Sequence, residues 1–224
     1  MRIGFVGDVN GNYEMLNNIC KDGNLDYIVT LGNFGIAPDS STFGNDNFQR
    51  MIFHKQMERF HCVVQAAVGQ KDNLGLANKY ASNKLFFESL LVIDDVYHYE
   101  RDSIIIIPKG YKPESYHKKE LHGKENRYFN DSIMEKVVKS KILCMHDFIY
   151  DRIDGNMIYN DDFARLIDKV DPDVILIGKY GWFTVSDYNK KNLVFLPKVT
   201  DGYFWYDSEK SQMHGVKTKF TLEV

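Results

Sequence analysis

The stretch that decides the fold is the start of the chain, Met1-Arg-Ile-Gly-Phe-Val-Gly-Asp-Val-Asn-Gly-Asn12. The apolar run from Ile3 to Val6 predicts a short buried strand that ends at Gly7. Asp8 follows at the carboxyl end of this strand, and Gly11 allows a tight turn before a helix. In open α/β sheets, ligands bind in the crevice outside the carboxyl ends of the strands. Asp8 is therefore a candidate ligand-binding residue, and capping of the next helix is the simpler alternative.

The pattern of buried strand, glycine turn and helix recurs over the next sixty residues. Helical spacing of apolar residues covers 13–21 and 48–60, apolar strands cover 26–31 and 61–68, and a polar loop covers 33–47. Strands that alternate with helices in this way predict βαβ units on a mostly parallel sheet.

The rest of the chain predicts a second sheet. Apolar or alternating segments at 85–93, 96–99 and 104–107 are expected to be antiparallel strands that enter it. Residues 108–131 are polar and irregular, which predicts an exposed insertion or lid within a single domain over 1–224. The later elements are predicted as helices over 132–139 and 161–170 and strands over 142–145, 173–177, 182–188, 193–197, 203–207 and, as a further candidate, 216–222.

Composition is that of an ordinary globular protein. The 224 residues are 44% hydrophobic and 26% charged, and the net charge of −3 gives no global case for nucleic acid. The three cysteines are scattered along apolar runs, which favours reduced thiols in a cytoplasmic protein over a disulfide framework. We expect no signal peptide and no membrane helix, because the chain begins with a core strand and no apolar run is long enough.

Five sequence blocks, each directly after a predicted buried strand, resemble in order the motifs of the calcineurin-like metallophosphoesterases. The first, Gly7-Asp-Val-Asn-Gly-Asn12, resembles the family's Gly-Asp-x-His-Gly-Asn. The other four are Leu31-Gly-Asn-Phe-Gly35, Val68-Gly-Gln-Lys-Asp-Asn73, Leu143-Cys-Met-His-Asp147 and Ile177-Gly-Lys-Tyr-Gly181. The resemblance spans nearly the whole chain and implies a four-layer α/β/β/α sandwich of two mixed sheets. It also implies a two-metal centre that clamps the attacking and leaving oxygens of a phosphoester.

Most of the metal ligands that the resemblance implies are replaced in this chain. Only Asp8 and His146 match ligand positions. The others hold Asn10 for a histidine, Asn33 for the bridging aspartate, Gln70 for an asparagine, and Lys179 and Gly181 for two histidines. Lys71 stands where the family has the histidine thought to protonate the leaving group. An amide is a neutral and weaker ligand, and a lysine ammonium, whose pKa is ordinarily about 10.4, repels a cation.

The preferred interpretation is a pseudoenzyme, a degenerate metallophosphoesterase-like protein without a cofactor that binds a protein partner or a small anionic, phosphate-containing ligand. Its candidate ligand-binding residues are Lys71, Lys179, Asn33 and Gln70. We expect the lysines to converge on the crevice, where one would pair with Asp8. A lysine there either binds an anion as a point charge or only fills a dead site.

The alternative is a divergent metal-dependent phosphoesterase with one divalent ion, Mn, Fe or Zn. Its ligands would be Asp8, His146, Asn33 and one of the acids between Asp147 and Asp162.

Two further features have simpler explanations. The basic cluster over 112–124 would suit nucleic acid, but a solvated loop face is the preferred explanation. The aromatic side chains of the closing strands are expected to pack in the core or at an edge, and an exposed stripe of them would indicate a partner surface. These aromatic residues are Trp182, Phe183, Tyr203, Trp205 and Tyr206.

Overall fold

The computed structural model describes residues 1–36, 60–69, 72–73, 75–77, 89–101, 103–108, 131–147, 150–153, 156–159, 161–217 and 221–224, with the backbone alone over 150–153 and 156–159. The helix predicted over 48–60 and the polar insertion with its basic cluster lie almost wholly outside these residues. So do Gln70 and Lys71.

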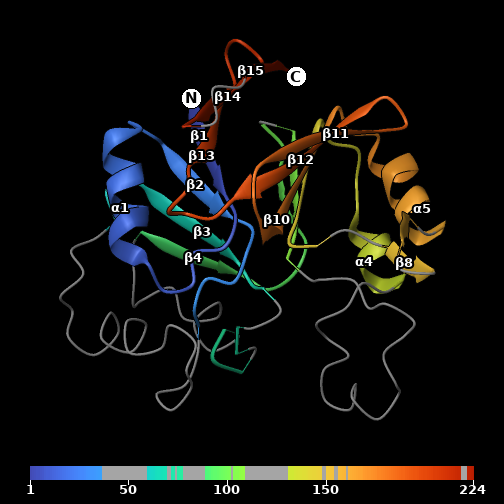
Figure 1. Cartoon of the computed structure of the whole chain (residues 1–224), viewed down its shortest axis with the longest axis horizontal. Helices are drawn as coiled ribbons and strands as arrows, with labels where there is room; N and C mark the ends of the chain where they lie inside the picture. Colours follow the sequence, from blue (N-terminus) through green and yellow to red (C-terminus); the bar gives the residue numbers. More distant parts are fainter. Residues whose placement is uncertain are drawn as a thin grey trace.

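Two mixed sheets form the centre of the molecule (Figure 1). The first has the order β15-β14-β13-β1-β2-β3-β4, which is Thr221–Glu223, Gln212–Val216, Tyr203–Asp207, Arg2–Val6, Tyr27–Thr30, Val63–Ala67 and Leu90–Ile93. The second has the order β11-β12-β10-β7-β6-β5, which is Thr184–Tyr188, Lys191–Pro197, Val174–Gly181, Ile142–Met145, Ile104–Ile107 and Tyr97–Tyr99. A separate hairpin pairs β8 (Tyr150–Ile153) with β9 (Asn156–Tyr159).

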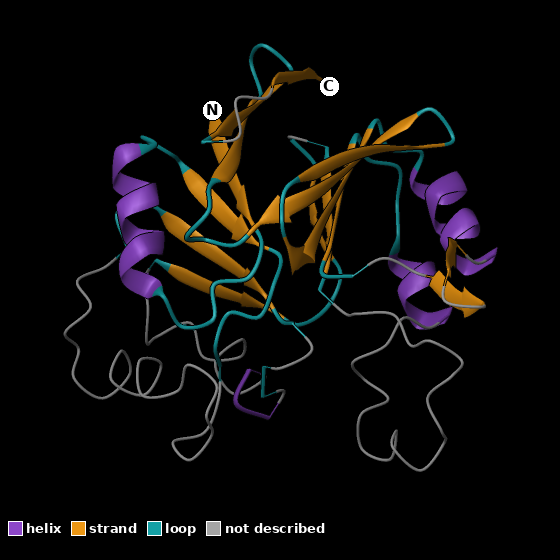
Figure 2. Cartoon of the chain, viewed as in Figure 1, coloured by secondary structure: helices purple, strands orange, loops and turns teal. Residues whose placement is uncertain are grey.

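The described helices cover the outer faces of the two sheets (Figure 2). Helix α1 (Tyr13–Asp22) lies on the first sheet, and α4 (Asp131–Lys136) and α5 (Asp161–Val170) lie on the second. The predicted four-layer α/β/β/α sandwich is confirmed. Within the described residues, none of the helices is long and apolar enough to cross a membrane.

The sequence predicted the positions of the strands better than it predicted their neighbours in the sheets and the direction of pairing. Segments 85–93, 96–99 and 104–107 were expected to be antiparallel strands of the second sheet. However, β4 extends the first sheet in parallel with β3, and β6 lies parallel to β7. The antiparallel pairing expected here is found between β5 and β6. Strand direction depends on the course of the connecting chain, which the apolar pattern does not encode.

Three other predictions need correction. The acidic segment after His146 was interpreted as a loop, but its described residues include the two strands of the β8–β9 hairpin. The single strand proposed over 216–222 covers parts of two strands, β14 and β15, which pair with each other in antiparallel fashion. The helix predicted over 132–139 ends at Lys136.

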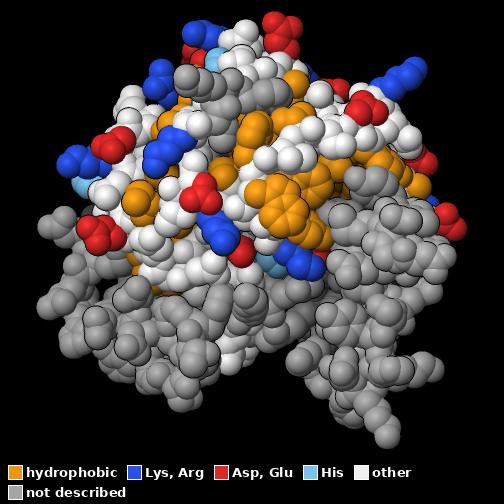
Figure 3. Space-filling model, in the orientation of Figure 1, with side chains coloured by type: hydrophobic (Ala, Val, Ile, Leu, Met, Phe, Trp, Pro, Cys, Tyr) orange, Lys and Arg blue, Asp and Glu red, His pale blue; other side chains and the backbone are white. Residues whose placement is uncertain are grey.

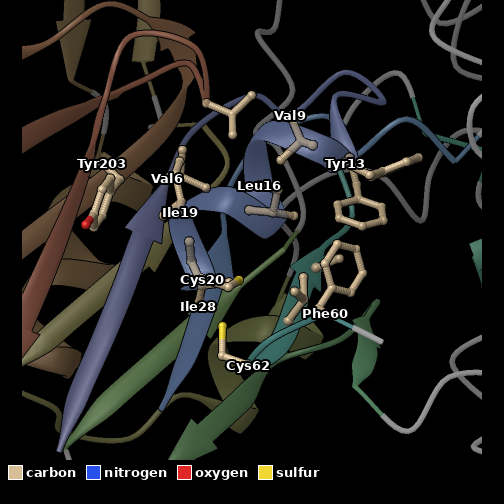
Figure 4. Close-up of a cluster of buried hydrophobic side chains, with 14 of the residues drawn as sticks. Val6, Val9, Tyr13, Leu16, Ile19, Cys20, Ile28, Phe60, Cys62 and Tyr203 are labelled. Carbon is tan, nitrogen blue, oxygen red and sulfur yellow. The ribbon is translucent and has the colours of Figure 1, made fainter. Parts of the chain in front are cut away.

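Burial follows from the alternation of side chains along the strands. In β2, Tyr27 and Val29 face the other sheet while Ile28 packs beneath α1. Figure 4 shows the layer under α1, where Leu16 and Cys20 meet the strands. Strands buried on both faces read as nearly continuous apolar runs, which is why the sequence located them well. The three cysteines, Cys20, Cys62 and Cys144, are buried free thiols, as predicted.

The carboxyl ends of the two sheets touch through backbone rather than side chains. A Cβ atom added to Gly178, within the last half of β10, would lie 1.9 Å from the carbonyl oxygen of Leu31, after β2. One added to Gly7, after β1, would lie 2.7 Å from the carbonyl oxygen of Gly178. The Gly7 amide donates to the carbonyl oxygen of Pro197, at the end of β12, over 2.9 Å. Glycine is required here because any side chain would push the sheets apart at this edge.

We therefore expect Gly178→Ala to lower the free energy of unfolding by about 3 kcal/mol, the upper end of the usual cost of overpacking. Chemical denaturation monitored by circular dichroism measures this loss. The matched control is Gly75→Ala, whose added Cβ would meet nothing closer than 3.4 Å. A Gly178 variant as stable as the control would contradict the close approach of the sheets.

Candidate functional site

The edge where the two sheets touch also brings together the residues that the sequence singled out. Asp8 follows β1, Asn33 follows β2, His146 follows β7 and Lys179 lies in the last part of β10. These strands run parallel within their sheets, so their carboxyl ends lie on one side. The Val199 amide, after β12, donates to the Asp8 carbonyl oxygen over 3.1 Å and ties the sheets together at this point.

Asp8 is held by the residue that replaces the family's bridging aspartate. The Asn33 backbone amide donates to Asp8 Oδ1 over 2.8 Å, and Asn33 Nδ2 lies 3.2 Å from Oδ1 and 3.4 Å from Oδ2. Both side chains are buried. A carboxylate that accepts several N–H donors is stabilised in its charged form without a cation. Asn33 thus supplies N–H donors to both oxygens of Asp8.

Capping of α1 is not the role of Asp8. Asn12 is the N-cap of this helix, and its side-chain oxygen accepts from the Met15 amide over 3.3 Å. Asn10, the other degenerate position of this block, has a φ of 51°, a left-handed conformation that asparagine tolerates. Among the described atoms, its buried Oδ1 has no hydrogen-bond partner.

His146 is fixed against the segment that carries Asn33. Its Nδ1 lies 3.0 Å from the Leu31 carbonyl oxygen. A carbonyl can only accept, so Nδ1 carries the hydrogen, which sets the ring's orientation. The ring is completely buried. His146 and Asp8 therefore contact the same short segment, Leu31 to Asn33, from opposite sheets.

Lys179 pairs with Asp147, so the lysine expected to pair with Asp8 would have to be Lys71, which lies outside the described residues. The Lys179 ammonium forms an ion pair with Asp147 Oδ2, and the Tyr180 hydroxyl donates to Oδ1 over 3.0 Å. The cause is strand register, because Ile177 of β10 is paired with Met145 of β7 and the residues two positions on lie side by side. Asp147 is almost fully buried, whereas 28% of the Lys179 side chain is exposed.

Asp72 is a site residue to which sequence reasoning gave no role. Its two oxygens accept from the backbone amides of Gly69, Phe34, Gly35 and Ile36 over 2.8–3.0 Å. Burial raises the pKa of Asp72, and the four N–H bonds act in the opposite direction. Burial, and then the charge of Asp72, also raise the pKa of Tyr13. Asp72 thus fixes the loop after β2 against the loop after β3.

The rim of the crevice has two features that the sequence did not predict. Trp182 was expected to pack in the core or at an edge, but 56% of it is exposed. Lys198 was not singled out at all, yet it lies between Pro197 and Val199, whose backbones bond to Gly7 and Asp8. The sequence feature that could have marked Lys198 is its position directly after a buried strand.

The donor groups of the described residues do not fit a two-metal centre. Asp8 is bound by Asn33, and Asp147 is bound by Lys179 and Tyr180. Across the described parts of the chain, no three His, Cys, Asp or Glu side chains gather closely enough to hold a metal ion. The side chains of 148–160, which the one-metal alternative needs, lie outside the description, as do Gln70 and Lys71.

Comparison with solved structures identifies the fold. The crystal structure of TT1561 from Thermus thermophilus is similar over 96% of this chain and 97% of that chain, with a TM-score of 0.60 and 15% sequence identity. The fold is metallophosphoesterase-like. GAP50, described as the anchor in the inner membrane complex of Plasmodium, matches over 100% and 88% of the two chains, with a TM-score of 0.61 and 12% identity.

Other comparisons add nothing to the fold. An archaeal phosphodiesterase also matches over 96% of this chain and 99% of that chain, at 13% identity and with a TM-score of 0.46. No protein-family model and no curated protein sequence matches the chain.

We expect Asp72→Asn to lower the free energy of unfolding by about 3 kcal/mol or more, because the amide nitrogen would face two backbone N–H donors that then have no acceptor. Urea denaturation measures the loss. The control is Asp173→Asn, which changes an exposed carboxylate and should be nearly neutral. Equal stability of the two variants would show that Asp72 does not hold the loops.

Proposed function

We propose that this protein is a catalytically degenerate metallophosphoesterase-like protein that binds a small anionic, phosphate-containing ligand at the carboxyl edge of its sheets without hydrolysing it. The observation that carries the proposal is the Lys179–Asp147 ion pair, because it puts an ammonium group where the resemblance implies a metal-binding histidine.

The buried carboxylates support the loss of metal-dependent catalysis. Asp8 is satisfied by the amide groups of Asn33, Asp72 by four backbone amides, and Asp147 by Lys179 and Tyr180. Loss of the bridging charge at Asn33 removes the main attraction that would hold two cations side by side. A phosphoester bound here would lack the metal-activated water that hydrolysis in this family requires.

The rim supports binding of an anion. The Lys179 ammonium has three N–H donors, of which Asp147 Oδ2 accepts one. Its side chain is more than a quarter exposed, so a ligand could reach the other donors. Lys198 adds a second positive charge, and it makes no ion pair with any residue that the structure describes.

Two alternatives rest on specific observations. Asp8 and His146 both contact the segment from Leu31 to Asn33, which keeps a one-metal phosphoesterase open if an acid from 148–160 joins them. Binding of a protein partner has a precedent by analogy in GAP50, whose description as an anchor belongs to that protein.

We expect the purified protein to hold far less than one metal ion per chain by elemental mass spectrometry, both as isolated and after soaking in excess Mn²⁺. The physical reason is that its carboxylates are already paired with protein donors. The control is the same measurement on Asp8→Ala. About one ion per chain that disappears in this variant, together with turnover of a phosphoester, would establish the one-metal alternative.

The affinity for inorganic phosphate tests the role of Lys179, because two variants should change this affinity in opposite directions. Lys179→Met should weaken binding of inorganic phosphate roughly tenfold in isothermal titration calorimetry, because it removes the cation. Asp147→Asn should strengthen binding roughly fivefold, because it removes the competing negative charge and leaves an amide oxygen for Tyr180.

Circular dichroism checks that both variants fold. If Lys179→Met unfolds because Asp147 is left buried without its cation, the double variant Lys179→Met/Asp147→Asn replaces it in the phosphate titration. A lysine that only fills a dead site predicts no phosphate binding in any of these proteins. Changes of affinity in the same direction in both single variants would also contradict the proposal.

A further inference from the structure

We propose that Trp182 and the lysines beside it form a subsite for a nucleotide, with the base stacked on Trp182 and the phosphate between Lys179 and Lys198. This inference rests on the proposed function and names the class of its ligand. It is carried by the geometry of an aromatic ledge, which we define as Trp182, Tyr180 and Phe195.

The three rings of the ledge pack against one another. The rings of Trp182 and Tyr180 are 5.2 Å apart between centroids, and those of Tyr180 and Phe195 are 5.5 Å apart. The Tyr180 hydroxyl donates to Asp147, which anchors the middle ring. Tyr180 and Phe195 also pack against the core beneath α4 and α5, so the exposed Trp182 rests on a rigid support.

The backbone holds Trp182 outward. Gly181 has a φ of 69°, a left-handed conformation that ends β10 and turns the chain away from the core. Trp182 follows directly and is 56% exposed, whereas large aromatic side chains are usually well buried. Figure 3 shows hydrophobic side chains gathered on this face of the molecule, over the region of β10 to β12, with lysine, arginine and acidic side chains beside them.

Two lysines flank the exposed ring. The Lys179 ammonium lies 5.7 Å from the Tyr180 centroid, so it is within about 11 Å of the Trp182 centroid. The stem of Lys198 passes over Gly181, since a Cβ added there would lie 2.6 Å from Lys198 Cε. The Lys179 ammonium and the Lys198 stem thus lie against Tyr180 and Gly181, the two residues before Trp182, which is the most exposed large hydrophobic side chain of the described chain.

This combination selects a ligand with a planar ring and a phosphate. Bases stack on aromatic side chains because every base has a π-face, and lysine binds phosphate as a point charge. A simple phosphate would use only the lysines, and a protein helix or apolar peptide would not need them. A nucleoside monophosphate uses all three groups at once.

The test compares AMP, ribose 5-phosphate and inorganic phosphate by isothermal titration calorimetry. AMP should bind roughly five- to a hundredfold more tightly than ribose 5-phosphate, the gain expected from stacking one base. Trp182→Ala should remove this gain and leave binding of ribose 5-phosphate unchanged, and Trp182→Phe should keep part of it. Lys198→Ala should weaken all three ligands together.

Fluorescence gives a second readout. The chain has two tryptophans, so Trp205→Phe leaves Trp182 as the single reporter, and AMP but not ribose 5-phosphate should quench it. Equal affinity for AMP and ribose 5-phosphate would overturn the nucleotide subsite while the phosphate site stands. Tighter AMP binding that survives in Trp182→Ala would place the base elsewhere and overturn it too. If none of the three ligands binds, the proposed function itself fails.

Discussion

The contact between the backbones of Gly178 and Leu31 is the constraint on which the rest of the site depends. It lets the carboxyl ends of both sheets meet without an intervening side chain. The Leu31 carbonyl oxygen that faces Gly178 also binds the His146 ring, so this close approach orients a residue of the other sheet. Glycine at these positions lets the carboxyl ends of strands from both sheets approach one another, so that the polar groups that follow the strands lie at one edge.

Charge in this crevice is balanced by the protein itself. Each of the three buried carboxylates has a different neutralising partner: the Asn33 amides for Asp8, four backbone amides for Asp72, and an ammonium and a hydroxyl for Asp147. A buried charge without such partners would destabilise the fold by several kcal/mol. The partners thus give the loops the cross-links that metal ions would otherwise provide, and they do so with residues that the sequence contains next to each buried strand.

Local sequence predicted what depends on local pattern. The strands around Phe5, Val29, Cys144 and Leu176 are buried on both faces, so their apolar runs were unambiguous in the sequence. The five sequence motifs that follow buried strands could therefore be located as well. The sheet and direction predicted for β4 were wrong because they depend on the long connections. The pairing of Lys179 with Asp147 was not foreseen because it depends on the register of β10 with β7. Lys198 and Asp72 were missed because the residues that they contact are far away in the sequence, so no local motif marks them.

The function that we propose rests on the distribution of charge at the carboxyl edge of the sheets. Asp8 accepts hydrogen bonds from Asn33, and the His146 ring donates through Nδ1 to the Leu31 carbonyl oxygen. At the rim, Lys179 and Lys198 keep exposed positive charge beside Trp182. We propose that this positive charge attracts an anion. Most of the metal-ligand positions that the resemblance implies are replaced in this chain, which is why we expect the anion to be bound and not hydrolysed.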